Sequence, residues 1–207
     1  MGVGQIETRP KLAIVDRDGT LIDVVRDEET GVIVTAFHPQ QIRFLGGALE
    51  GLCTLRDAGF LIAIATNQPG PAKGQCTAAA VLRTNEALVA SLAREGIVVA
   101  SLQVCMHHPR GGHGGDVSLA HACDCRKPQP GLLTAALRET GADPEASWMI
   151  GDTRSDLEAA ERAHVRSALV FSSDRCELCP LRGGPAGSPD VHGPSVAAVA
   201  RGILQFH

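Results

Sequence analysis

The segment 16–20 (DRDGT) follows directly on the short apolar run 12–15 (LAIV). In an extended chain, residues two apart point to the same side, so the carboxylates of Asp16 and Asp18 can face one reaction centre. Two carboxylates this close repel each other unless a cation lies between them, and Mg²⁺ is the usual cation for all-oxygen ligands. A carboxylate in such a site can also attack phosphorus. The segment therefore predicts a buried strand that ends at a polar, metal-binding site.

Apolar runs and amphipathic stretches alternate along the rest of the chain. We expect strands at 11–16, 61–66, 98–104, 147–151 and 166–171, and helices at 46–58, 74–94, 131–141, 154–163 and 195–205. Strands that alternate with helices predict an α/β fold, in which a central parallel sheet lies between two layers of helices. Ligands bind such sheets beyond the carboxyl ends of the strands, which is where Asp16, Thr66 and Asp152 stand.

The length of 207 residues suits one domain with its own core, which we expect to occupy 1–207. Within it we expect the core at about 11–171 and a C-terminal loop and helix at about 172–207. The segments 108–122 and 182–195, rich in glycine, are predicted to be surface loops.

Charge and hydropathy exclude several classes of protein. The formal net charge is -4, and no basic patch indicates a nucleic-acid partner. No apolar run approaches the roughly 20 residues of a membrane span, and the start has no signal-peptide core. We therefore expect a cytoplasmic protein with neither a membrane nor a nucleic acid as its partner. We also expect a monomer.

Four of the residues that follow the third predicted strand form two pairs with the spacing of metal ligands. Cys105-x-His107 and Cys123-x-Cys125 each place two ligands on one side of an extended chain. Three thiolates and one imidazole would form a closed tetrahedral site, typical of structural zinc. The rival imidazole ligands are His108, His113 and His121. Free thiols beside a lone histidine are the alternative interpretation.

Four motifs, in chain order over roughly residues 11 to 170, resemble the haloacid dehalogenase superfamily of phosphotransferases. They are DRDGT at 16–20, Thr66-Asn67 after a second apolar run, Arg126-Lys127-Pro128, and Gly151-Asp152 followed by Asp156. The resemblance implies a single Rossmann-like three-layer domain with a zinc-binding loop at about 105–125. The intervals between the motifs are short, so we expect no large cap domain.

The resemblance also implies a role for each residue of the motifs. Asp16 would attack phosphorus, and Asp18 would act as general acid and then general base. Magnesium would be held by Asp16, Asp152 and the backbone carbonyl of Asp18. The phosphoryl group and the substrate would be bound by Thr66, Asn67, Arg126 and Lys127. Asp156 would orient Lys127 or a metal-bound water, or would simply cap a helix.

The pattern Cys-x-His-His-Pro, a loop, and Cys-Asp-Cys-Arg-Lys-Pro from 105 to 128 narrows the resemblance. It is similar to the capless phosphatases that act on D-glycero-D-manno-heptose 1,7-bisphosphate. This resemblance implies Mg²⁺ as a catalytic cofactor and zinc as a structural ion. It also implies a small phosphorylated sugar as the substrate, from which the 7-phosphate is removed. A histidinol-phosphate phosphatase, or a phosphatase of another small sugar phosphate, is the alternative. A zinc-stabilised binding module without catalysis is the alternative from another class.

Some residues depart from that pattern. Pro69 and Pro71 replace smaller residues, and Lys73 stands where an arginine is expected, which removes bidentate geometry. The motif Cys176-x-x-Cys179 is a weak signal for a second metal or a redox role, and we favour a loop with two thiols. A second site with Cys53 and Cys76 would require the fold to bring them together.

Overall fold

The computed structural model describes residues 9–26, 29, 31–172 and 187–206. Its centre is a six-stranded sheet in the order β5-β4-β1-β6-β7-β8, and every neighbouring pair in it is parallel. The strands are β1 (Lys11–Val15), β4 (Phe60–Asn67), β5 (Val99–Cys105), β6 (Trp148–Gly151), β7 (Arg166–Val170) and β8 (Val191–Gly193). The predicted α/β fold with a central parallel sheet is confirmed.

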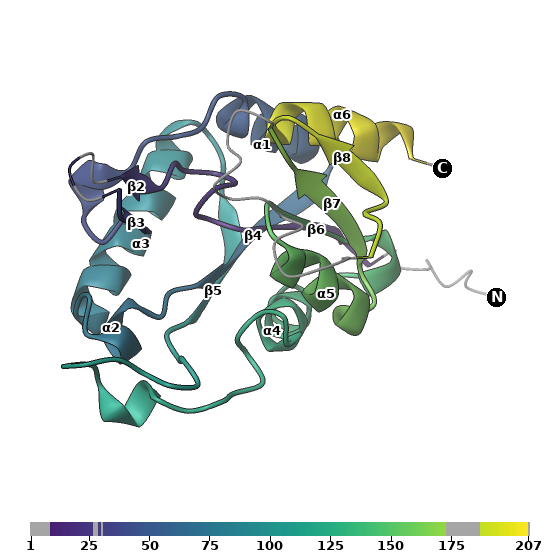
Figure 1. The fold of residues 1–207 in the computed structure, drawn as a ribbon. Helices are drawn as coiled ribbons and strands as arrows, with labels where there is room; N and C mark the ends of the chain where they lie inside the picture. Colours follow the sequence, from purple (N-terminus) through teal and green to yellow (C-terminus); the bar gives the residue numbers. More distant parts are fainter. Residues whose placement is uncertain (1–8, 27–28, 30, 173–186, 207) are drawn as a thin grey trace.

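Helices cover both faces of this sheet (Figure 1). Along β1, Ala13 and Val15 point to the face covered by α1, α3 and α6, whereas Leu12 and Ile14 point to the face covered by α4 and α5. The helices are α1 (Ala48–Asp57), α3 (Ala78–Arg94), α4 (Gly131–Thr140), α5 (Arg154–Ala163) and α6 (Val196–Gln205). Because β1 is buried on both faces, its sequence is continuously apolar rather than alternating.

The five expected strands, and four of the five expected helices, begin and end within two residues of their predicted bounds. The helix expected at 74–94 is wrong at its start, because the chain forms a short helix α2 (Gly70–Lys73) before α3. Gly74 ends α2 in the left-handed conformation at φ 72°, and the side chain of Thr77 accepts a hydrogen bond from the Ala80 amide to start α3.

The loop expected at 182–195 is also wrong in part, since β8 forms the edge of the sheet beside β7. Its three residues, Val-His-Gly, are too few and too polar to show a strand period. A two-stranded hairpin of β2 (Val25–Arg26) and β3 (Ile33–Val34) lies between β1 and α1. None of the helices that the structure describes is long and apolar enough to cross a membrane.

Candidate active site

The predicted catalytic residues meet where the carboxyl ends of β1, β4 and β6 lie side by side. Asp16 follows β1, Thr66 stands near the end of β4, and Asp152 follows β6. All three line one cavity of about 320 Å³, together with Asp18 and Lys127. Strand β3, the segment after it and α2 also contribute residues to the lining of this cavity. The topology therefore brings residues more than 100 positions apart into one site, as the motifs predict.

Lys127 is the centre of the polar network in this cavity. Its Nζ donates hydrogen bonds to Asp16 Oδ1 at 2.6 Å and to the Ala65 carbonyl at 2.8 Å, and it forms an ion pair with Asp156 Oδ1 at 2.6 Å. Burial by itself lowers the pKa of an amine, but the Asp156 and Asp16 carboxylates outweigh burial and raise the pKa of Lys127. Lys127 is therefore a permanent, fixed positive charge beside Asp16.

Asp16, Asp152 and Asp156 form a buried cluster in which one oxygen of each lies within 4.8 Å of the others. Burial raises the pKa of Asp16 to about 7; Lys127 opposes this rise, whereas the neighbouring carboxylates add to it. Burial and the Asp16 charge also hold the pKa of Asp152 well above its ordinary value. One lysine cannot balance three buried carboxylates, so the site favours a further cation.

The donor set of this cluster fits a divalent cation that prefers oxygen, such as Mg²⁺. Asp156 is already occupied, because Lys127 binds one of its oxygens and the other accepts hydrogen bonds from the amide and hydroxyl of Thr153. Asp16 and Asp152 are thus the carboxylates that remain for a cation. The Asp18 side chain lies outside the cluster, and its expected contribution is the backbone carbonyl.

Two glycines allow the carboxylates to come this close. Gly19 has a φ of +87°, and a Cβ there would lie 2.2 Å from Asp152 Oδ2. A Cβ on Gly151 would lie 2.4 Å from the Asp156 carboxyl carbon. Any larger residue at either position would push a carboxylate out of the cluster, which explains the glycines of both acidic motifs.

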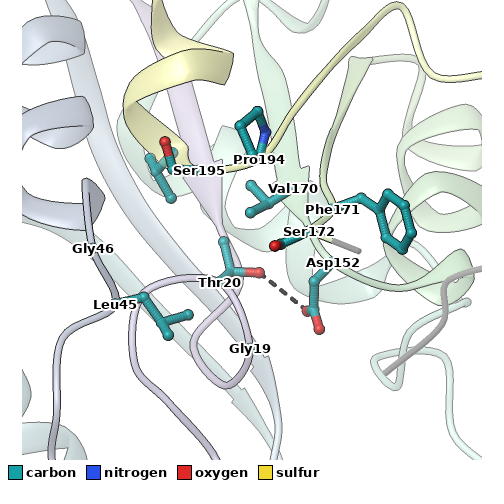
Figure 2. A pocket seen from close by; sticks show the side chains of 11 residues that line it. Gly19, Thr20, Leu45, Gly46, Asp152, Val170, Phe171, Ser172, Pro194 and Ser195 are labelled. Carbon is teal, nitrogen blue, oxygen red and sulfur yellow. Dashed lines mark hydrogen bonds between the residues drawn. The ribbon is translucent and has the colours of Figure 1, made fainter. Parts of the chain in front are cut away.

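A second, smaller cavity of about 170 Å³ lies against Asp152 (Figure 2). Thr20 and Asp152 both line it, and the Thr20 hydroxyl donates a hydrogen bond to Asp152 Oδ1 at 3.1 Å. Pro194 and Ser195, at the start of α6, form part of another wall. Thr20 thus fixes the orientation of the Asp152 carboxylate that faces the main cavity.

The Asp18 carboxylate is held by an arginine that lies between the two aspartates of the motif. Arg17 is fully buried, and its Nε and Nη2 atoms lie 2.9 and 3.1 Å from the two Asp18 oxygens. Its Nη1 donates to Asn85 Oδ1 at 2.6 Å, which ties this pair to α3. The amide of Gln68 donates to Asp18 Oδ2 at 2.6 Å and to the Thr66 hydroxyl at 2.8 Å.

Sequence reasoning missed Arg17, Gln68 and Asn85. Arg17 could have been identified from the sequence, because it is a charged residue that directly follows a buried apolar strand. A buried guanidinium requires partners, and its nearest acid is Asp18. Asn85 lies 68 positions away in sequence and gives no such signal.

Asn67 acts on Lys127 through the backbone. Its side-chain carbonyl accepts a hydrogen bond from the Lys127 amide at 3.1 Å, and its side-chain amide donates to the Lys127 carbonyl at 3.0 Å. This pair of bonds fixes the peptide that carries the lysine. The motifs predict that Asn67 binds the phosphoryl group, and the contact of its side chain with the Lys127 peptide is an additional role.

The cysteines and the histidine predicted to bind zinc form a second cluster, Cys105, His107, Cys123 and Cys125. The Sγ atoms of Cys125 and Cys105 are 3.1 Å apart, those of Cys125 and Cys123 are 3.2 Å apart, and His107 Nδ1 lies 3.4 Å from Cys125 Sγ. Ligands about 2.3 Å from a tetrahedral ion lie only slightly further apart than this. The three rival histidines do not belong to the cluster, although all of them are described.

The chemistry of this second cluster also fits a metal. Burial and the neighbouring thiols raise the pKa of Cys125, because thiolates packed together are unstable without a cation. Arg126 follows directly, and its Nη1 donates to the His107 carbonyl at 3.3 Å. The Arg126 side chain is not among the groups that line the cavity, whereas Lys73 is. Contact between Arg126 and a substrate stays a prediction.

The other two cysteines that the structure describes, Cys53 and Cys76, are free thiols and do not belong to a group of metal ligands. Cys53 lies on α1, and Cys76 lies beside Gly70, between α2 and α3. The pair Cys176 and Cys179 lies outside the described residues.

Comparison with known proteins places the chain among phosphatases. The HAD-hydrolase-like family model matches residues 124–178. A D-glycero-β-D-manno-heptose-1,7-bisphosphate 7-phosphatase of Pasteurella multocida (strain Pm70) is 32% identical over 165 residues, which cover 80% of this chain and 83% of that protein. The protein of the same name from Escherichia coli (strain K12) is 32% identical over 161 residues, 78% of each chain.

A crystal structure shares both fold and length with this chain. It is the D,D-heptose 1,7-bisphosphate phosphatase of B. bronchiseptica, solved in complex with magnesium and phosphate. The two superpose with a TM-score of 0.73 at 29% sequence identity, over 95% of this chain and 99% of that one.

Proposed function

This chain belongs to the family of haloacid dehalogenase-like phosphatases that includes the D-glycero-β-D-manno-heptose-1,7-bisphosphate 7-phosphatases, and we propose that it removes the 7-phosphate of that sugar. The resemblance inferred from the motifs is confirmed, and the protein is a phosphatase. The observation that carries the proposed chemistry is the contact between Asp16 and Lys127. It places a carboxylate and a fixed cation together at the base of a cavity.

In the first step, an oxygen of Asp16 attacks phosphorus and a phosphorus–oxygen bond forms. The bond from phosphorus to the sugar O7 breaks, and Asp18 donates its proton to that oxygen as it leaves. In the second step, Asp18 takes a proton from a water molecule that attacks the aspartyl phosphate. The Asp16 carboxylate and inorganic phosphate are then restored, and Asp18 is again protonated.

The position of the Asp18 carboxylate supports its proposed role. Gln68 and Arg17 both hold it, so it cannot rotate freely in the cavity. A carboxylate fixed two residues from Asp16 is placed to exchange a proton first with the leaving oxygen and then with water.

Charge neutralisation supplies most of the rate in phosphoryl transfer. We assign this role to Lys127, with the Thr66 hydroxyl and the Asn67 backbone amide as further donors to the phosphoryl oxygens. Asp156 would keep Lys127 protonated and oriented, as its 2.6 Å contact with the ammonium indicates. Magnesium, bound by Asp16, Asp152 and the Asp18 carbonyl, would add a further positive charge beside the phosphoryl group.

We assign zinc to the cluster of three cysteines and one histidine, as a structural ion with no open coordination position. The cluster ends at Cys125, two residues before Lys127. Ordering of this loop would therefore fix the peptide that carries the catalytic lysine. Apart from that, zinc would have no part in the reaction.

The test is phosphate release with Mg²⁺ from the β and α anomers of the heptose 1,7-bisphosphate, from histidinol phosphate and from an aryl phosphate. Asp16→Asn is the control. A preference for the β anomer that the variant abolishes would support the proposal. Turnover of histidinol phosphate in preference to both anomers would replace the substrate and keep the chemistry. Full activity of the variant would refute the role of Asp16.

A further inference from the structure

Lys73 is a second cation that faces the active-site cavity. It lines the cavity together with Lys127 and is half-buried at the end of α2. Lys127 is already neutralised by Asp16 and Asp156, whereas the Lys73 ammonium has no hydrogen bond or ion pair with any residue that the structure describes. A cation held at a cavity wall without a partner favours an anion in that part of the cavity.

The cavity thus offers a positive charge that the reacting phosphoryl group does not need. A phosphoryl group at Asp16 would be neutralised by Lys127 and would leave the Lys73 charge unused. A second anionic group on the same substrate would use it.

The position of Lys73 depends on the segment 106–122. We call this segment the metal loop because it contains His107 and runs between Cys105 and Cys123, in the cluster to which we assign zinc. A Cβ on Gly112 would lie 2.6 Å from the Lys73 carbonyl oxygen and 2.9 Å from its Cα. A Cβ on Gly115 would lie 2.0 Å from the Ala72 carbonyl oxygen. The backbone of the metal loop thus packs directly against the backbone of α2.

A hydrogen bond fixes the register of this contact, because the Asp116 amide donates to the Pro71 carbonyl at 2.9 Å. Neither Gly112 nor Gly115 has a positive φ, so both are needed for close approach rather than for conformation. The helix α2 has only four residues, and a helix of this length is not stable on its own. The metal loop supplies part of the packing that holds α2 in place.

We propose that Lys73 binds the phosphate that is not hydrolysed, and that the metal loop selects bisphosphates by holding Lys73 at the cavity wall. An ammonium beside phosphate oxygens would form a charge-assisted contact of the kind that gives affinity and orientation. The inference rests on the proposed function, since it assumes a sugar with two phosphates. It assigns to the metal loop a role in specificity as well as in support of Lys127.

The first test compares kcat/KM for the heptose 1,7-bisphosphate with kcat/KM for the heptose 7-phosphate. For Lys73→Ala we expect a loss of roughly 10- to 100-fold on the bisphosphate, the effect of one charge-assisted hydrogen bond, and little change on the 7-phosphate. Lys73→Arg should recover most of the preference. The matched control is Lys11→Ala, which removes a lysine from the amino end of β1, and it should leave both values unchanged.

Equal losses on both substrates, or no loss on either, would overturn the role of Lys73. A wild-type protein that hydrolyses neither compound would refute the proposed function itself, and the inference with it. These two failures are distinguishable, because the first requires an active wild-type enzyme.

The second test addresses the metal loop. Gly112→Ala should reduce kcat/KM for the bisphosphate selectively, and Gly187→Ala, where a Cβ meets nothing within 4 Å, is the control. In the Lys73→Ala background, Gly112→Ala should cause no further loss of preference. If Gly112→Ala reduced the preference for the bisphosphate by the same factor in that background, Gly112 would not act through Lys73. Gly115→Ala serves as a second variant if thermal unfolding shows that Gly112→Ala does not fold.

Discussion

The stability of the magnesium-free protein should rise as the pH falls from 8 to 6. Burial raises the pKa of the Asp16 carboxyl from an ordinary 3.8 to about 7 in the folded protein. The folded state therefore binds a proton that the unfolded state releases. The resulting stability is fully present below the unfolded pKa and is lost as the pH rises through about 7. Asp152, whose pKa is also raised, should add to the effect with the same sign.

The magnitude follows from the populations of the protonated carboxyl. With a folded pKa of about 7, lowering the pH from 8 to 6 stabilises the folded state by about 1.4 kcal/mol through Asp16 alone, out of a full range of about 4 kcal/mol. For a chain of this length, about 1.4 kcal/mol corresponds to a rise in Tm of roughly 3 to 6 °C. Saturating Mg²⁺ should remove this rise, because it favours the ionised carboxylates.

The assay is thermal unfolding of zinc-loaded protein, dialysed free of magnesium, at pH 6, 7 and 8. Asp16→Asn is the matched control, since it keeps every histidine that titrates in this window but cannot bind the proton. The difference in Tm between wild type and variant should change by several degrees across the series. Parallel curves, or a wild type that loses stability relative to the variant at low pH, would refute the reasoning.

Three further predictions concern Lys127, the cysteine cluster that precedes it and the Asn67 side chain that holds its peptide. Lys127→Met should abolish phosphate release and lower the free energy of unfolding by about 3 to 5 kcal/mol, because it leaves buried carboxylates unpaired; an unfolding curve in urea that matches wild type would contradict this. Cys123→Ser should reduce bound zinc, measured by elemental analysis, and should speed amide hydrogen exchange across 106–122. Unchanged exchange would show that the metal does not order this loop. Asn67→Ala should cost about 1 to 3 kcal/mol of stability and lower kcat, since it frees the Lys127 peptide; a kcat equal to that of wild type would show that this peptide is held by other contacts.

The sequence predicts the fold well because its central strands are buried on both faces. β1, β4 and β6 are continuous apolar runs that end in polar motifs, so both their position and their direction can be read without the structure. β8 could not be predicted in this way, since it is short and forms only because β7 offers it an edge. The break between α2 and α3 depends on one left-handed glycine, Gly74, which helical periodicity does not reveal.

The predicted residues of the site lie at the ends of those same strands, so their meeting follows from the topology. The sequence does not predict which side chains hold these catalytic residues in place. The contacts of Arg17 with Asn85, and of Asn67 with the Lys127 backbone, join segments 60 or more positions apart through single side chains. Nothing in the local pattern marks these pairs. In the sequence, Lys73 is only a departure from an expected arginine, and its place in the cavity depends on the packing of the metal loop.

The central claim is that Asp16 becomes phosphorylated during turnover. The most direct measurement is reduction with borohydride of enzyme quenched while it hydrolyses the heptose 1,7-bisphosphate with Mg²⁺, followed by peptide mass spectrometry. The account predicts that the side chain at position 16 is reduced to homoserine, and that Asp16→Asn treated in the same way is unmodified. Homoserine at position 18 with none at 16, or an Asp16→Asn variant that still releases phosphate at the wild-type rate, would contradict it.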